Sequence, residues 1–318
     1  MKRRTPDSAI ITKRTLLERI RLDFKHNAAL YAMLLIPLAI IIIFRVAPMW
    51  GIQIAFRDYR PARGISGSRF VGLKYFEKFL KSYQFGQVMR NTLLINLYTL
   101  ATFPLSLVFA LMLNYLGFRR FRKTVQMVSY APHFISTVVL CSMVLEFTKT
   151  RGGMINSVLG LFGVEAANWM AKPEYFYSIY VWSGVWQELG YNSIIYISAL
   201  AGISPELHEA ATVDGASLLK RIWHVDIPGV LPTFCIMLIL SCGKLMTVGY
   251  EKILLLQNNV NIEVSEVIST YAYTIGLATK TPQYSYSAAI SLFTSIINMI
   301  MLFTVNRLSN KLSNNSLW

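Results

Sequence analysis

The chain contains little charge and few cysteines or histidines. Of its 318 residues only 15% are charged, four are histidine and three are cysteine. Cys141, Cys235 and Cys242 lie in apolar stretches, with neither the spacing of a disulfide framework nor that of a metal site. The histidines form no H-E-x-x-H or comparable cluster. We therefore expect no metal site, and we expect the cysteines to pack as small apolar side chains.

A phosphate-binding loop is also missing. The motif G-x-x-x-x-G-K-[ST] would hold the phosphates of a nucleotide, but Gly243-Lys244 is followed by leucine inside an apolar stretch. We therefore predict that the chain is not an enzyme, has no catalytic residue and holds no cofactor of its own.

A basic module for nucleic acid is absent despite the net charge of +15. The basic residues are spread around the ends of apolar stretches instead of forming one basic surface. We therefore expect membrane lipids with anionic headgroups, and no nucleic acid, to be partners of this charge.

Apolar residues are abundant, at 54% of the chain, and the mean hydropathy is +0.44. A helix needs about 20 mostly apolar residues to cross a bilayer. The sequence therefore predicts an all-α, polytopic membrane protein with six transmembrane helices. The predicted spans are Leu30–Trp50, Thr92–Leu113, Val125–Phe147, Tyr175–Leu200, Val230–Tyr250 and Tyr286–Val305. Pro104 and Pro132 lie inside helical patterns and are expected to bend the second and third spans.

The predicted domains are a basic N-terminal segment (1–29), a six-span domain (30–308) and a short tail (309–318). Lysine and arginine cluster before the first span, between the second and third, and after the sixth, all on one side of a six-span topology. This bias predicts that both termini are cytoplasmic. The long segment between the first two spans is also basic, from Arg57 to Arg90, and would lie outside. It could meet an acidic protein face or an anionic solute, or be a solvated folded loop without a ligand.

One polar segment has the pattern of a helix, a turn and a second helix. Ser204 is a candidate N-cap, Pro205 fits the first helical position, and a short helix is predicted from Glu206 to Val213. Gly215 allows a positive φ at the turn, and a second short helix is predicted from Ser217 to about Val225. Pro228 and Pro232 fit the start of the next helix better than its interior.

The letters of this segment, E-A-A-x-x-D-G-A from Glu209 and I-P-x-x-L-P from Ile227, resemble the EAA loop of permease subunits in bacterial binding-protein-dependent ABC importers. The resemblance implies a type I permease fold in which a cytoplasmic loop, here 204–228, forms coupling helices that insert into an ATPase. The residues that it assigns to ATPase coupling are Glu206, Glu209, Ala210, Ala211, Asp214, Gly215, Ala216, Pro228 and Pro232. Ile222 departs from the aromatic residue frequent in sugar permeases, although Trp223 is adjacent.

A second segment, Gly153–Leu159, resembles the G-x-I-N-x-x-L stretch of carbohydrate permeases. The long basic N-terminus and the order of the spans resemble those of permeases for complex polysaccharides, near the maltose type. The resemblance as a whole implies a permease subunit in the bacterial cytoplasmic (inner) membrane that moves a carbohydrate, expected to be an oligosaccharide. It also implies three kinds of partner: a second homologous permease, two ATP-binding cassette subunits that bind ATP and Mg, and an extracytoplasmic solute-binding protein.

Polar side chains within spans are costly unless they face a cavity or a partner. Aromatic rings can stack on sugar faces, while amides and carboxylates can bind hydroxyls. The candidate substrate path is therefore Trp182, Trp186, Gln187, Glu188, Tyr191 and Asn192 in the fourth span, with Lys244 and Tyr250 in the fifth. Alternatively, Glu188 pairs with Lys244 and the tryptophans pack between helices.

Three alternatives stay open from sequence. The importer could carry a non-sugar solute such as a polyamine, phosphate or glycerol phosphate. The chain could be a secondary transporter without an ATPase, although no convincing inverted repeat is present and only Glu146 and Glu188 are carboxylates at depth. It could also be a membrane-bound structural or assembly protein. Whether a sugar cargo is acidic is also left open.

Overall fold

The computed structural model describes residues 24 and 26–313, so most of the basic segment 1–29 and the end of the tail lie outside the described residues. The chain divides into two compact units, which meet between Gln53 and Ile54 and are described separately. The first contains α2 (Ala28–Ile41), a π-helical turn η1 (Ile42–Val46) and most of the 3₁₀ segment η2 (Ala47–Phe56). Together these elements form one apolar helical stretch of 29 residues. The first predicted span is therefore helical, and it is longer than predicted.

The second unit begins with a small hairpin and a short helix. Strand β1 (Arg57–Arg60) pairs antiparallel with β2 (Gly64–Phe70) across the turn η3 (Pro61–Arg63), and α3 (Lys74–Leu80) follows. The Tyr59 amide donates to Ser285 Oγ at 2.9 Å, and the Tyr75 hydroxyl donates to Asp58 Oδ1 at 2.8 Å. Burial and the bond to Asp58 raise the pKa of Tyr75 to about 12, so its hydroxyl stays a donor at neutral pH. The basic segment between the first two spans is therefore folded.

The second and third spans are both interrupted at proline. The second consists of α4 (Tyr83–Thr102) and α5 (Leu105–Asn114), which meet at Pro104. The third consists of α6 (Arg119–Tyr130), η4 (Ala131–Phe134) and α7 (Thr137–Thr148), with a bend of 101°. The predicted bend at Pro132 is confirmed, and it is sharp enough to divide the span into two helices. Pro132 lacks an amide hydrogen, Ile135 is extended, and the Ser136 hydroxyl caps α7, so the chain starts a new helix in a new direction.

The remaining elements are α8 (Met154–Gly160), η5 (Trp169–Ala171), η6 (Pro173–Tyr175), α9 (Phe176–Ala201), α10 (Pro205–Val213), α11 (Leu218–Arg221), η7 (Ile222–Asp226), α12 (Ile227–Cys242), α13 (Tyr250–Leu256), α14 (Ile262–Ser265), α15 (Ile268–Tyr273), η8 (Thr274–Ala278) and α16 (Tyr284–Ser313). The fifth span, predicted to reach Tyr250, ends at Cys242. Residues 243–249 form turns and irregular structure, so Lys244 lies outside the helix.

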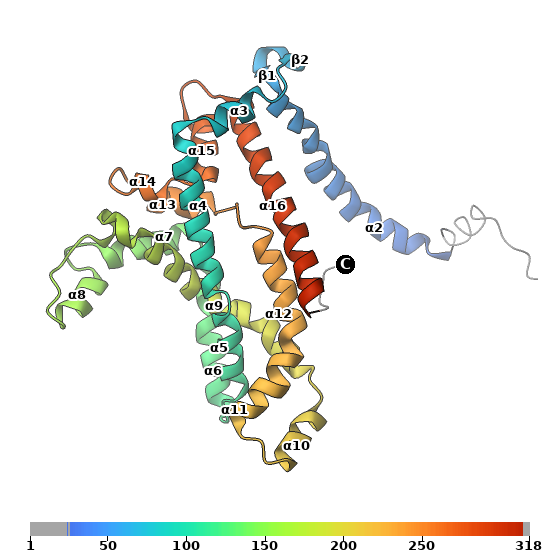
Figure 1. Ribbon diagram of the computed structural model, residues 1–318, viewed down its shortest axis with the longest axis vertical. Coiled ribbons are helices and arrows are strands. Elements are labelled where there is room, and N and C mark those ends of the chain that lie inside the picture. The colour runs from blue at the N-terminus through green and yellow to red at the C-terminus, as the bar shows by residue number, and fades with distance from the viewer. Residues whose placement is uncertain (1–23, 25, 314–318) are drawn as a thin grey trace, which may run out of the picture. The chain divides into compact units, whose positions relative to one another are not determined.

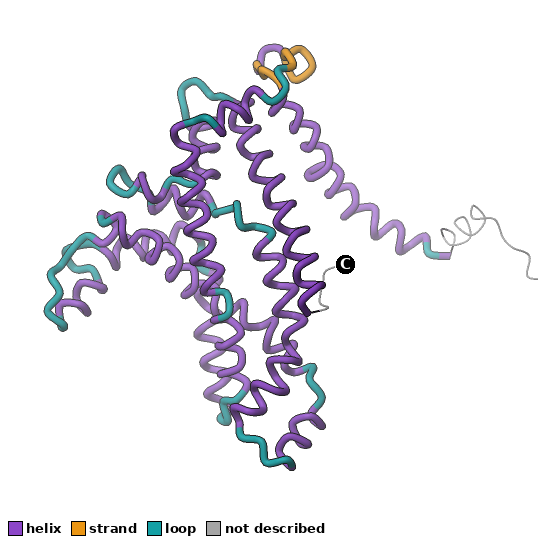
Figure 2. The backbone as a smooth tube through the Cα atoms, viewed as in Figure 1, coloured by secondary structure: helices purple, strands orange, loops and turns teal. Residues whose placement is uncertain are grey.

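Helices dominate the described chain, as Figure 2 shows, and this confirms the all-α prediction. Within the described residues, four helices are long and apolar enough to cross a membrane. There are five if the two bent halves of the third predicted span, 119–134 and 137–148, count as one. The fourth predicted span is α9, whose 26 residues reach about 39 Å at roughly 1.5 Å per residue. This length exceeds the ~30 Å of hydrocarbon, although α9 is more polar than the others. The six-span prediction is consistent with this arrangement.

Three clusters of buried side chains hold the second unit together. Near the hairpin, α3, α4, α15 and α16 pack around Phe79, Tyr271 and Tyr286. In the middle, α7, α9 and α13 pack around Leu140, Phe176 and Ile253. Towards α10, the helices α5, α9 and α12 pack around Ala110, Tyr196 and Val230. Figure 1 shows the hairpin and α10 at opposite ends of this unit.

The segment that resembles G-x-I-N-x-x-L is organised by its buried asparagine. Asn156 Nδ2 donates to the carbonyl oxygens of Lys149 and Ala167, each at 2.8 Å. Its Oδ1 accepts from Trp169 Nε1 at 2.7 Å. One side chain in α8 thus connects the end of α7 to the chain that leads into α9. It does so by hydrogen-bonding backbone carbonyl groups that have no partner in a helix.

We predict that Asn156→Ala lowers thermal stability in detergent, because it leaves buried backbone groups and the Trp169 indole without partners. Each unpaired group costs roughly 1–3 kcal/mol. The readout is the loss of folded, monodisperse protein on heating. Asn259→Ala, at an exposed position, is the matched control and should melt like the parent. Equal melting of the Asn156 and Asn259 variants would contradict the assignment.

Candidate functional site

The loop with the E-A-A motif folds as two helices around a glycine. Helix α10 begins at Pro205 and ends at Val213, and Gly215 has a φ of +71°. The Ala216 amide donates back to the Ala211 carbonyl at 2.9 Å, which closes the helix end. The helix, the proline position and the turn were all predicted. Ser204 precedes the helix, but its hydroxyl does not cap it, which corrects that part of the prediction.

The second helix of the loop is not a separate element. Segments α11, η7 and α12 run on as one helix of 25 residues, Leu218–Cys242. Pro228 lies in the first turn of α12, whereas Pro232 lies inside the helix and not at its start. A proline there removes a single ladder bond, which membrane helices tolerate. The loop therefore connects directly to the span that follows it.

The surface of α10 is open. Leu207 is 56% exposed and Val213 is 88% exposed, while Glu206, Glu209 and Ala210 are exposed as well. Trp223 of η7 adds another large exposed side chain. Asp214, Gly215 and Ala216 form the turn at the tip of the loop. The loop thus presents an apolar and acidic surface that its own chain does not cover.

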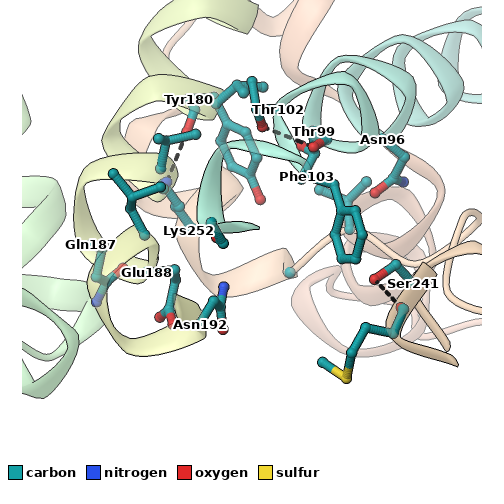
Figure 3. A pocket seen from close by; sticks show the side chains of 18 of the residues that line it. Asn96, Thr99, Thr102, Phe103, Tyr180, Gln187, Glu188, Asn192, Ser241 and Lys252 are labelled. Carbon is teal, nitrogen blue, oxygen red and sulfur yellow. Dashed lines mark hydrogen bonds between the residues drawn. The ribbon is translucent and has the colours of Figure 1, made fainter. Parts of the chain in front are cut away.

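A cavity of ≈ 450 Å³ lies between α4, α5, α9, α12 and α13. This volume is typical of small-molecule sites, which span about 300–1,000 Å³. Hydroxyl and amide groups line much of it. They belong to Asn96, Thr99, Thr102, Ser106, Tyr180, Gln187, Asn192, Tyr196, Ser241 and Thr247. In Figure 3, Glu188, Asn192 and Lys252 lie on one side of the cavity, and Phe103 and Ser241 lie on the other. Such a lining can hydrogen-bond a solute rich in hydroxyl groups.

The lining residues include one acid and one base. Glu188 Oε2 lies 2.9 Å from His133 Nδ1, and the His133 ring stacks on Tyr191 with centroids 3.6 Å apart. Lys252 reaches from α13 to α9, where its Nζ donates to the Tyr180 carbonyl at 2.8 Å. The same Nζ stands 4.5 Å from the centroid of the Tyr180 ring. The Lys252 ammonium has three N–H donors, so two remain beyond the bond to Tyr180.

The structure brings only part of the predicted substrate path to this cavity. Gln187, Glu188 and Asn192 line it. Trp182 and Trp186 instead line an apolar groove beside α7 and α8, and Trp182 Nε1 donates to the Tyr98 hydroxyl at 2.9 Å. Both tryptophan side chains are about half exposed in this groove.

The two candidates of the fifth span also lie away from the cavity lining. Lys244 is exposed in the segment after α12, and Tyr250 stacks on Tyr273 with ring centroids 5.4 Å apart. The alternative pairing of Glu188 with Lys244 is not seen, since Glu188 pairs with His133. Contact of any of these residues with substrate stays a prediction.

Lys252 was missed by sequence reasoning. It is the lone base in α13, whose other residues are mostly apolar. A single lysine in such a stretch was a usable signal, because a base among apolar residues usually faces a cavity or a partner. Among the described residues, no group of three or more His, Cys, Asp or Glu side chains could hold a metal ion.

Comparisons with known proteins identify the family of this chain. A sequence profile described as "Binding-protein-dependent transport system inner membrane component" matches residues 79–314. The polygalacturonan/rhamnogalacturonan transport system permease protein YteP of Bacillus subtilis (strain 168) is 37% identical over 304 residues, which cover 95% of this chain and 94% of that protein.

Solved structures of a bacterial ABC transporter that imports the acidic polysaccharide alginate are also similar. One superposes with a TM-score of 0.84 at 33% identity and covers 93% of this chain and 99% of the solved chain. Another, in complex with a periplasmic protein that holds an alginate pentasaccharide, gives a TM-score of 0.85 at 33% identity, with coverage of 94% and 100%. The fold is therefore that of an ABC importer permease. The chain belongs to the family of inner-membrane components of binding-protein-dependent transport systems.

Proposed function

We propose that this permease subunit of a carbohydrate ABC importer carries acidic oligosaccharides through the cavity beside Lys252. The observation that supports the acidic cargo most directly is the position of the Lys252 ammonium in the cavity wall. A carboxylate on a sugar ring would accept a charge-assisted hydrogen bond from it, which is about twice as strong as a neutral one. The hydroxyl and amide groups around it suit the remaining sugar hydroxyls.

The relatives support the same cargo. One is named for the transport of polygalacturonan and rhamnogalacturonan, and the solved importer takes up the acidic polysaccharide alginate. In this chain the cavity residues Glu188 and Lys252 carry opposite charges, and Glu188 is engaged by His133. Lys252 is therefore the basic lining residue that would bind an anionic sugar, by the two N–H donors that remain beyond its bond to Tyr180.

Helix α10 is the proposed contact with a separate ATPase chain. Its exposed apolar side chains Leu207 and Val213 offer area for docking, and Glu206 and Glu209 are exposed beside them. Two ATP-binding cassette subunits would bind ATP and Mg and hydrolyse the ATP, while this chain moves the solute. The coupling roles of Ala210, Ala211, Asp214, Gly215, Ala216, Pro228 and Pro232 are part of this proposal.

The remaining partners are a second homologous permease and a solute-binding protein. The family works with a binding protein, and the solved importer was seen in complex with its periplasmic protein. The hairpin end carries exposed Arg60, Arg63 and Arg69, which suit an acidic protein face. As a multi-pass inner-membrane protein, the chain would place this hairpin outside and α10, with both termini, in the cytoplasm.

The docking proposal predicts the effect of Gly215→Pro. Proline fixes φ near −65°, which is incompatible with the +71° of Gly215, so the turn after α10 cannot form. Sugar uptake should fall at least about tenfold while the protein still inserts in the membrane, since one strained turn costs of order 1–3 kcal/mol. Gly215→Asn, which tolerates positive φ, is the control and should retain most uptake. Unchanged uptake with proline would count against the coupling role.

The cargo proposal predicts a selective effect of Lys252→Met. In proteoliposomes with the binding protein loaded, uptake of an acidic oligosaccharide should fall by about tenfold or more, since a hydrogen bond to a charged group contributes roughly 1.5–3 kcal/mol. Uptake of its carboxyl-reduced, neutral counterpart should change little. Lys252→Arg should keep acidic uptake because it keeps the charge, and Lys244→Met is a matched control outside the cavity lining. An equal loss for both sugars would show that Lys252 only holds α13 to α9.

A further inference from the structure

Helix α10 has few attachments to the rest of the molecule. None of its residues is buried, and only His208 and Ala211 are partly buried. A displacement applied to its exposed surface must therefore pass through a small number of contacts. Two polar contacts of α10, those of His208 and Thr212, reach the helix Leu218–Cys242.

The partner of His208 is Asp226, whose side chain is 1% exposed. Asp226 is the last residue of η7 and the N-cap of α12. Its Oδ1 lies 3.4 Å from His208 Nε2, beyond ordinary hydrogen-bond distance, and this buried oxygen has no hydrogen-bond partner among the described residues. Its Oδ2 accepts from the hydroxyl of Tyr115, which directly follows α5, at 2.5 Å. One buried carboxylate therefore meets α10, α5 and α12.

A buried carboxylate makes such a junction stiff. Desolvation of an acid is costly unless it is paired, so separation of either partner leaves an uncompensated group. Burial and the bond to Asp226 raise the pKa of Tyr115 to about 12, so the phenol remains a donor at neutral pH.

Apolar packing closes the base of the same loop. A Cβ atom at Gly229 would lie only 2.5 Å from Cδ1 of Ile203, so α12 and the chain entering α10 are in direct contact. Arg221 Nη1 also donates to Thr212 Oγ1 at 3.3 Å, which ties α11 to α10. These contacts connect α10 and the chain entering it to the helix Leu218–Cys242.

We infer that Asp226 is a positioning residue for energy coupling, and that it passes the displacement of α10 to α5 and α12 through His208 and Tyr115. Both recipient helices contribute to the cavity, by Ser106 of α5 and by Ser241 of α12. A shift at α10 would thus move two walls of the cavity together. This inference rests on the proposed docking of α10 to an ATPase.

The test compares variants in the importer reconstituted with its ATPase subunits and binding protein. The measured quantity is the number of sugars imported per ATP hydrolysed. Tyr115→Phe removes the buried hydrogen bond, and Asp226→Asn removes the negative charge that makes this bond charge-assisted. Each variant should lower the ratio roughly two- to tenfold while the ATPase subunits still co-purify. The double variant should lose no more than Asp226→Asn alone, because both act through the same contact.

Tyr130→Phe is the matched control. It removes the hydroxyl of a partly buried tyrosine in α6 that interacts with Ser193 of α9 and not with α10, so its ratio should equal that of the parent. An unchanged ratio in the Asp226 and Tyr115 variants would overturn the inference. So would a parallel fall of uptake and ATP hydrolysis with loss of folded protein, which would make Asp226 a structural anchor only. If the parent chain itself binds no ATPase, the proposed function fails together with the inference.

Discussion

The structure depends on the need to satisfy every backbone polar group inside a hydrocarbon layer, which leaves helices as the main element. Where the helices break, side chains from neighbouring elements replace the lost partners. Gln187 Nε2 donates to the Ile135 carbonyl at the break in the third span, at 2.9 Å. Asn298 Oδ1 accepts from the Met246 amide after α12, at 2.8 Å. These breaks bring polar groups to the middle of the second unit, and the cavity lies beside them.

The cavity and the α10 loop are two parts of one arrangement because they share helices. The α12 helix continues from the loop itself, and α5 ends next to it at Tyr115. Both helices also carry cavity residues. In the proposed function a separate ATPase binds α10, whereas the solute binds in the cavity. Helices shared by the loop and the cavity would connect these two sites. The exposed apolar surface of α10 is unusual for a loop helix, and the proposed docking to an ATPase would cover it.

Local chemistry could be predicted from sequence, and distant contacts could not. Pro205 and Gly215 set α10 and its turn through their own backbone preferences, so both were predicted correctly. The sharp break after Pro132 depends on how Ser136 starts a new helix, which periodicity does not reveal. The positions of Trp182 outside the cavity and of Lys252 in its wall depend on which helices pack together. A periodic pattern defines the apolar face of a helix but not the helix that packs against it. Asp226 next to the motif gave no signal, as its partners are far away in the chain.

The most direct measurement of the central claim is purification of the tagged chain from its native membrane in mild detergent, with mass spectrometry of the proteins that accompany it. The account predicts an ATPase that contains a phosphate-binding loop, together with a second permease that contains its own E-A-A motif. Recovery of the stable, folded chain without any nucleotide-binding protein would contradict the account and favour a transporter driven by an ion gradient.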